Sequence, residues 1–265
     1  MTQSATHCHP PGSGHQKMIW SQALNLKKEG VSRPEALIAM KNEWSGYHKD
    51  ISPAILRVTE KVFSGNLKKD TGKKSWPEAD KNEIEAVADK NPYSLQELRK
   101  ESPYPESKLG KISSLGLLQL LFPKGSLVCL GESVQSCSTK KLEEFFCSNE
   151  NLPFIVPRTM SEEYGVSLDG EISNRCNNNT GPERFVVIEF DDMEENVQVS
   201  MIKHLSQFLP LVLVLHSGGK SFHAWFNGCD SSEERVLAFR RHAASLGADK
   251  AVFTRCQMVR MPNQR

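Results

Sequence analysis

Hydrophobic and polar positions follow their clearest pattern in the last third of the chain, from Phe185 to Arg260. Apolar runs alternate there with stretches in which apolar residues recur every three or four positions, which predicts strands and helices in turn. Over residues 221–226 polar and apolar residues alternate singly, which predicts a strand with two different faces. The predicted order is strand, helix, strand, strand, helix, strand, at residues 185–191, 196–208, 211–215, 221–226, 231–247 and 251–261.

This order is that of a split βαβ, or ferredoxin-like, unit of type βαββαβ. With right-handed crossovers, we expect the third strand to lie beside the first and parallel to it, and the fourth to run antiparallel on the first strand's other side. Such a sheet brings Glu189 and Asp191, at the end of the first strand, near His223 on the third. Asp249 returns to the same end before the fourth strand. Three carboxylates and a histidine are therefore expected to converge.

The acidic pair is the first candidate for chemistry. Glu189 and Asp191 are two positions apart, so on a strand both side chains point to one face. With Asp249 they form a set of oxygen ligands suited to a hard cation such as Mg²⁺ or Mn²⁺. An acidic pair at a strand end is also common as a solvated surface feature. The apolar strand before the pair and the partner at Asp249 favour the metal site.

A glycine-rich segment joins the second and third strands, and it reads Ser217-Gly218-Gly219-Lys220. The glycines offer backbone N–H groups without obstruction and the lysine adds a positive charge, which together suit a triphosphate. An ordinary hairpin turn with a solvated lysine is the alternative. A Walker A loop is excluded, because it requires a glycine where Val214 stands and a helix where the pattern predicts a strand.

Three further residues extend the candidate site. His223 shares a strand face with Ser221, across from the carboxylates, which favours a contact with phosphate or nucleotide over a place in the core. Arg260 lies in the last predicted strand. It is a second phosphate clamp if it faces the site and a surface arginine if it does not.

In this order, the three motifs resemble the signature of the archaeo-eukaryotic primase superfamily. They are most similar to those of the primase-polymerase domains of phages, plasmids and other mobile elements. The resemblance covers roughly residues 109–265 and implies an RRM-like core, with a glutamate at 189 where many members have an aspartate. By this resemblance Glu189, Asp191 and Asp249 hold the divalent metals, and Lys220, Ser221 and His223 contact the incoming nucleotide.

The resemblance also implies an activity, namely metal-dependent nucleotidyl transfer by a DNA primase or polymerase that makes or extends primers. Its partners are a single-stranded DNA template and NTPs or dNTPs, in the replication of a phage or mobile element. A replicative helicase would be a separate activity, since the chain has no Walker A loop. Two other classes stay open: a catalytically weak replication initiator or nucleic-acid-binding module on the same fold, and a regulatory domain that binds NTP.

The predicted fold class is α+β, in three parts. Residues 1–66 predict a small bundle of three helices, with capping signals at Ser32 and at Ser52-Pro53. Residues 67–108 are expected to be a linker with short helices. The primase-polymerase core is expected at 109–265, where an additional α/β module precedes the RRM-like unit.

Composition changes this picture little. With 38% hydrophobic and 25% charged residues and a net charge of +1, the chain resembles a globular protein, and the first 75 residues hold 12 basic against 6 acidic side chains. A basic segment can neutralise phosphates, although solvated lysines explain it equally well. No apolar run reaches membrane-spanning length and no signal-peptide core is present, so we expect no membrane association and a cytoplasmic location with reduced cysteines.

Overall fold

The computed structural model describes residues 14–45, 52–63, 75–104, 108, 111–147, 152–167, 171–216, 218–219 and 221–262. The chain forms two compact units. The first consists of residues 1–69 together with 164–173, and the second of residues 70–163 and 174–265. The fold is a mixture of helices and small antiparallel sheets, in agreement with the α+β class predicted from the sequence.

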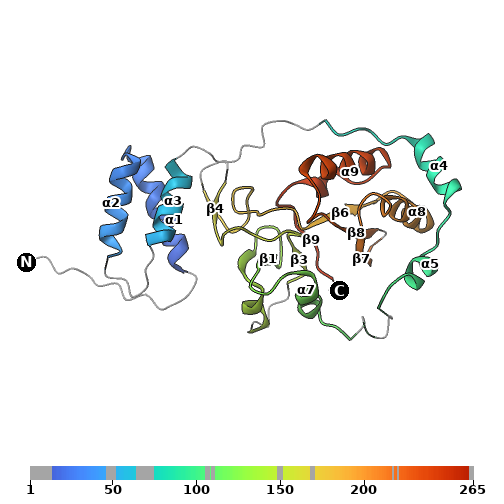
Figure 1. Cartoon of the computed structure of the whole chain (residues 1–265), viewed down its shortest axis with the longest axis horizontal. Coiled ribbons are helices and arrows are strands. Elements are labelled where there is room, and N and C mark those ends of the chain that lie inside the picture. The colour runs from blue at the N-terminus through green and yellow to red at the C-terminus, as the bar shows by residue number, and fades with distance from the viewer. Residues whose placement is uncertain are drawn as a thin grey trace, which may run out of the picture. The chain divides into compact units, whose positions relative to one another are not determined.

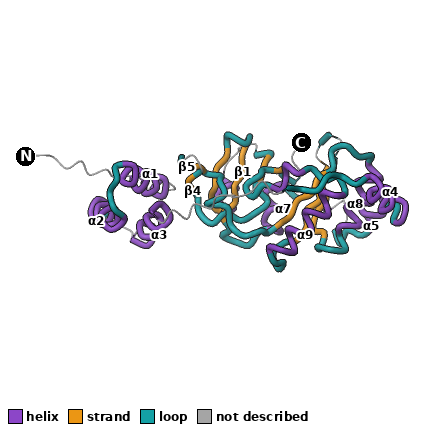
Figure 2. Tube along the Cα trace, turned by 90° about the horizontal axis from the view of Figure 1, so that it is seen from above, coloured by secondary structure: helices purple, strands orange, loops and turns teal. Residues whose placement is uncertain are grey.

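The first unit is a bundle of three helices, seen along their axes in Figure 2: α1 (Gly14–Lys28), α2 (Arg33–Glu43) and α3 (Ser52–Phe63). Its centre contains Trp20, Met40 and Val58, all at most 1% exposed. The capping box predicted at Ser32 is present and starts α2. The hairpin of β4 (Gly165–Val166) and β5 (Ile172–Ser173) adds Val166 to this core, although the sequence pattern placed it with the later residues.

The second unit contains two sheets. One has the strand order β2-β1-β3-β9 and the other the order β6-β8-β7. The strands are β1 (Leu127–Gly131), β2 (Cys137–Lys141), β3 (Phe154–Ile155), β6 (Phe185–Glu189), β7 (Leu211–His216), β8 (Phe222–Asn227) and β9 (Val259–Arg260). The helices beside them are α4 (Lys81–Lys90), α5 (Leu95–Lys100), α7 (Ser114–Leu121), α8 (Glu195–Leu205) and α9 (Glu233–Ser245), with 3₁₀ helices at Leu142–Cys147 and Lys250–Phe253.

Strands β6 and β8 are buried on both faces, whereas β7 is partly exposed. On one face Ile188 and Ala224 pack with α8 and α9. On the other, Val187 and Trp225 pack with α7, β1 and β3, so the sheet lies between two layers (Figure 1). Alternation along β8 therefore separates two cores, as the sequence pattern predicts, and leaves His223 on the same side as Trp225.

One predicted strand direction is wrong. The sequence analysis placed the third strand parallel to the first, whereas β8 runs antiparallel to β6, with Glu189 opposite His223. The physical reason is that β8 forms a hairpin with β7 and lies between β6 and β7. A right-handed crossover through α8 makes β6 and β7 point the same way, so a strand between them that pairs with both must oppose both.

The predicted fourth strand does not join this sheet either. Asp249 donates one backbone hydrogen bond to the carbonyl oxygen of Glu189, and its side chain then accepts from Ala251 and begins the 3₁₀ helix. An aspartate that caps a helical turn in this way competes with strand pairing. The only strand in the predicted range is β9, which pairs with β3 in the other sheet.

Helices α4 and α5 lie in the range that the sequence analysis assigned to a linker. They pack along α8, with Val87 buried in the same core as the β6-β8-β7 sheet. The backbone N–H of Tyr93 donates to the Ser200 hydroxyl, and Lys203 pairs with Glu101 at 2.6 Å. Residues 75–101 are thus part of the second unit.

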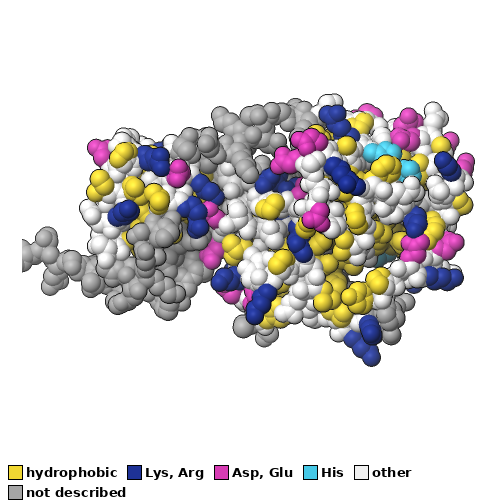
Figure 3. All heavy atoms as spheres, in the orientation of Figure 1, with side chains coloured by type: hydrophobic (Ala, Val, Ile, Leu, Met, Phe, Trp, Pro, Cys, Tyr) yellow, Lys and Arg dark blue, Asp and Glu magenta, His cyan; other side chains and the backbone are white. Residues whose placement is uncertain are grey.

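No helix in the described ranges is long and apolar enough to cross a membrane. On the face shown in Figure 3, acidic and basic side chains are interspersed with apolar ones. This mixture accords with the net charge of +1, and neither sign of charge dominates that face.

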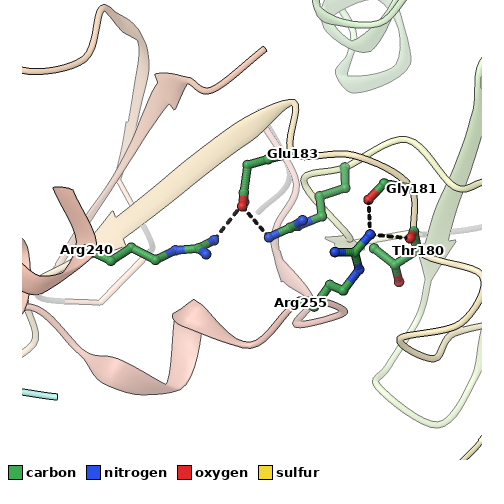
Figure 4. A network of polar contacts seen from close by, with 6 residues as sticks. Thr180, Gly181, Glu183, Arg240 and Arg255 are labelled. Carbon is green, nitrogen blue, oxygen red and sulfur yellow. Dashed lines mark hydrogen bonds and ion pairs between the residues drawn. The ribbon is translucent and has the colours of Figure 1, made fainter. Parts of the chain in front are cut away.

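Glu183 joins two arginines from separate parts of the second unit. Its carboxylate pairs with Arg158 and, at 2.7 Å, with Arg240 on α9 (Figure 4). Beside them, Arg255 donates to the carbonyl oxygens of residues 180–181, at 2.8 Å each. These bonds hold the loop before β6 against α9 and against the segment that leads to β9.

We therefore predict that Glu183→Ala destabilises the second unit. Arg158 is 5% exposed, and loss of its carboxylate leaves a buried positive charge unpaired. Breaking a buried pair in this way typically costs about 3–5 kcal/mol in the free energy of unfolding. Urea denaturation followed by circular dichroism measures the change. Glu85→Ala, at an exposed position of α4, is the matched control and should leave the midpoint almost unchanged; equal midpoints for the two variants would contradict the prediction.

Candidate functional site

A cleft of about 590 Å³ in the second unit contains most of the site predicted from the sequence. The end of β6, the start of β8, the 3₁₀ helix at 250–253 and β9 all contribute to its walls. Ser217 and Lys220 lie outside the described residues. The other eight predicted residues all line the cleft: Glu189, Asp191, Gly218, Gly219, Ser221, His223, Asp249 and Arg260.

Glu189 and His223 form the centre of this site. They are directly opposite each other in the β6–β8 ladder, and His223 Nε2 lies 2.8 Å from Glu189 Oε1. The Ser221 hydroxyl donates to the same oxygen at 2.7 Å. Ser221 and His223 are 5% and 4% exposed, so both bonds are shielded from water. One carboxylate oxygen therefore fixes the orientation of two buried polar side chains.

The protonation of this pair follows from its surroundings. Burial acts to raise the pKa of Glu189, but the hydrogen bond and charge of His223, with the bonds from Ser221 and Asp191, outweigh it and leave that pKa below its ordinary value. An ionised Glu189 requires the shared proton to be on His223 Nε2. The other ring nitrogen, Nδ1, is buried and has no hydrogen-bond partner within the described part of the chain.

The pKa of Asp191 is shifted in the opposite direction, upwards. Partial burial raises its pKa, and the negative charge of Glu189, a hydrogen bond to Glu189 and the charge of Asp249 raise it further. The folded protein thus binds this proton more tightly than the unfolded chain. Asp191 contributes stability below its ordinary pKa and loses that contribution as the pH rises through the raised pKa. For Glu189 the sign is reversed, and its contribution is lost as the pH falls.

The three carboxylates fit a hard cation in chemistry and in charge. All of them line the cleft, and the raised pKa of Asp191 shows that they repel one another. Oxygen ligands of this kind suit Mg²⁺ or Mn²⁺. Among the described residues, however, no three His, Cys, Asp or Glu side chains are close enough to hold one ion as they stand. A metal would therefore require a rotation of at least one of these side chains.

The turn that contains Gly218 and Gly219 forms another part of the cleft wall. Gly218 has a φ angle of +88°, which residues with a side chain rarely adopt, and a Cβ added there would meet nothing within 4 Å. Its backbone N–H donates to His216 Nδ1 at 3.1 Å. The glycine is thus required for the shape of the turn, and it leaves the neighbouring backbone open towards the cleft.

Arg260 reaches the cleft from the other sheet. It is exposed on β9, where its guanidinium lies 5.2 Å from the centre of the Phe154 ring. The sequence analysis expected it on a strand beside β6, which is wrong, but the pairing of β9 with β3 still brings it to the same cleft.

The sequence analysis missed the wall built by the β2-β1-β3-β9 sheet. Phe154, Gln257 and Met258 line the cleft, together with Val252 and Val259. Nothing in the local sequence pattern connects residues 154–155 to residues a hundred positions later. Only the β3–β9 pairing reveals that connection.

Comparison with protein-family models, with curated proteins and with solved structures finds no match to this chain.

The electrostatic coupling in the cleft can be tested directly. We predict that Glu189→Gln lowers the pKa of Asp191 towards its ordinary value, because the substitution removes the negative charge beside it. Carboxyl-carbon NMR across a pH titration measures this shift. Glu97, whose pKa is lowered by its hydrogen bonds with Ser94 at the start of α5, serves as the control and should keep that pKa in both proteins. An unchanged or higher pKa at Asp191 would show that the two carboxylates do not interact.

Proposed function

We propose that this chain is a metal-dependent nucleotidyltransferase of the primase-polymerase type, which joins nucleotides on a single-stranded DNA template. One observation carries the proposal. Acidic residues at 189 and 191, a histidine at 223, a third acid at 249 and an arginine at 260 all line one cleft. These residues come from separate motifs, and their order and spacing resemble those of the archaeo-eukaryotic primase superfamily.

The order of elements supports an RRM-like core within this proposal. Strand β6, helix α8, the β7–β8 hairpin and helix α9 follow one another as they do in a split βαβ unit. In the sheet, β8 lies between β6 and β7. The 3₁₀ helix at 250–253 lies beside β6, where a fourth strand would complete the sheet. We therefore assign residues 185–253 to an RRM-like core whose fourth strand is replaced.

In the proposed reaction, Asp191, Asp249 and the remaining oxygen of Glu189 would hold Mg²⁺ or Mn²⁺. Such ions lower the pKa of an attacking hydroxyl and neutralise charge on phosphates during phosphoryl transfer. The carboxylates repel one another, and a bound cation would relieve that repulsion. Asp191 is the most exposed of the three, so it is the residue most free to turn towards the ion.

The remaining residues would orient the nucleotide. Arg260, already placed against Phe154, offers a planar set of donors to phosphate oxygens. Gly219, which lines the cleft beside Gly218, would offer a backbone N–H close by. Glu189 holds His223 and Ser221 at the base of the cleft, where His223 Nδ1 is buried without a hydrogen-bond partner among the described residues. The chain thus supplies a negative side for metal and a positive side for phosphate.

The decisive test is nucleotide incorporation on a primed and an unprimed single-stranded template, with Mn²⁺ and either NTPs or dNTPs. We predict that Asp191→Ala abolishes the product. Loss of a supporting group near a metal reduces activity by about 10- to 100-fold, and loss of a direct ligand should exceed this.

Asp192→Ala is the matched control, since it removes the same side chain one position further, where the residue is exposed and does not line the cleft. It should retain the activity of the unsubstituted chain. If wild type and Asp191→Ala made equal product, the proposal would fail. DNA binding without any incorporation by the wild type would instead favour a nucleic-acid-binding module.

We also predict that Arg260→Ala raises KM for the nucleotide while changing kcat less. A hydrogen bond to a charged group contributes about 1.5–3 kcal/mol, so the expected increase in KM is roughly tenfold to a hundredfold. Steady-state incorporation at varied nucleotide concentration measures it. Arg241→Ala, on the exposed side of α9, removes an equal charge outside the cleft and should leave KM unchanged. An equal effect of both substitutions would indicate a general charge effect.

A further inference from the structure

Two cysteines stand together on the β1–β2 hairpin, outside the acidic cleft. In the strand register Cys129 lies opposite Thr139, and Cys137 lies opposite Gly131. Positions 137 and 139 are two apart, so Cys137 is on the same face of the sheet as Cys129 and diagonal to it. Both cysteines are reduced, and their side chains are close enough for each to shift the pKa of the other.

The surroundings of the two thiols differ. Cys129 is fully buried, in an apolar cluster with Val156 and Met258, whereas Cys137 is half-buried at the edge of that cluster. The Arg175 guanidinium lies beside Cys137. It donates to the carbonyl oxygen of Val134 at 3.2 Å, the same oxygen that Cys137 Sγ approaches at 3.9 Å.

These contacts shift the pKa values of the two thiols in opposite directions. The hydrogen bond from Cys129 lowers the pKa of Cys137 to about 6 against the effect of burial, and the positive charge of Arg175 lowers it further. The same hydrogen bond, together with burial, raises the pKa of Cys129 far above its ordinary range. The pair therefore favours the thiolate on Cys137, beside the Arg175 guanidinium, and keeps the proton on Cys129.

Two simpler roles account for less of this arrangement. A buried cysteine often acts as a small apolar side chain, which fits Cys129 but not a half-buried thiolate next to an arginine. A structural zinc site needs about four ligands. In the described residues no group of three His, Cys, Asp or Glu side chains could share an ion, and this includes the surroundings of the pair.

We propose that Cys137 and Cys129 form a redox-active dithiol, in which Cys137 is oxidised by hydroperoxides and Cys129 then closes a disulfide with it. The reactive thiolate is beside a cation and partly accessible, and a second thiol is already in contact with it. These are the features of a cysteine that reacts with peroxide next to a resolving cysteine.

The chemistry balances in two steps. The Cys137 thiolate attacks one oxygen of the hydroperoxide and the O–O bond breaks, so that Cys137 becomes a sulfenic acid and the leaving oxygen takes a proton from water. The Cys129 sulfur then attacks the Cys137 sulfur, an S–S bond forms, and the leaving hydroxide combines with the Cys129 proton as water. Two thiols are oxidised by two electrons and one peroxide is reduced.

Closing the disulfide should displace the cleft wall. Diagonal positions in a sheet have Cα atoms about 7–8 Å apart, whereas a disulfide favours roughly 5.5–6 Å, so the hairpin must shift as the bond forms. Strand β1 pairs with β3, which in turn pairs with β9, and Met258 touches both the thiol cluster and the cleft. An effect of oxidation on nucleotide transfer, unlike the oxidation itself, rests on the proposed function.

The test uses the full chain, treated with one equivalent of hydrogen peroxide at neutral pH, alkylated and digested with trypsin. Cys129 and Cys137 fall in one tryptic peptide, residues 125–140. We expect this peptide to become lighter by two hydrogen atoms and to resist alkylation until dithiothreitol is added. Cys229, the exposed cysteine among those described, is the internal reference. Oxidation at Cys137 should exceed that at Cys229 by about tenfold, because only a thiolate reacts quickly.

Variants separate the two roles. Cys129→Ser should leave Cys137 as a sulfenic acid that dimedone traps, and Cys137→Ser should leave Cys129 unoxidised, with circular dichroism confirming that each variant folds. Cys229→Ser is the matched control and should not alter the 125–140 disulfide. Preferential oxidation of Cys229 in the wild type would overturn the proposal, as would a mixed disulfide between two chains in place of the internal bond. Neither outcome depends on any polymerase activity.

Discussion

The register between β6 and β8 is the constraint on which the candidate site depends. It places Glu189 opposite His223, and a slip of one residue would turn His223 and Ser221 to the opposite face of the sheet. The register is fixed by apolar packing on both faces. Val187 and Trp225 pack on one face, and Ile188 and Ala224 pack with α8 and α9 on the other. Two hydrophobic cores thus determine where a buried polar pair forms.

The same packing explains how the polar pair is tolerated. A buried histidine and carboxylate are costly unless each satisfies the other. The Glu189 side chain accepts hydrogen bonds from Ser221 and His223, and its backbone carbonyl oxygen accepts one from the backbone N–H of Asp249. Through this one residue, the end of β6 connects the side chains of β8 with the start of the 3₁₀ helix. The acidic residues far apart in the sequence are brought to one cleft by main-chain as well as side-chain bonds.

Much of this arrangement can be predicted from the sequence, and each wrong prediction has a physical cause. Alternation along β8 and the helical repeat in α8 and α9 depend on local periodicity, so those elements and their buried faces could be predicted. Strand direction does not affect periodicity, and for β8 it follows only from its place between β6 and β7. The pairing of Ile155 with Val259 joins two short strands about a hundred residues apart, which no local signal encodes.

The two walls of the cleft differ in how firmly they are held. Glu189 belongs to a β6–β8 ladder of five residue pairs packed between two cores, whereas Arg260 is carried by a ladder of two residue pairs at the edge of another sheet. Short ladders at an edge open at a lower free-energy cost than buried central strands. Opening of the β3–β9 ladder would therefore widen the cleft on the Arg260 side while Glu189 keeps its place opposite His223. Such a cleft can accept ligands of different size while the charged residues at its base keep their alignment.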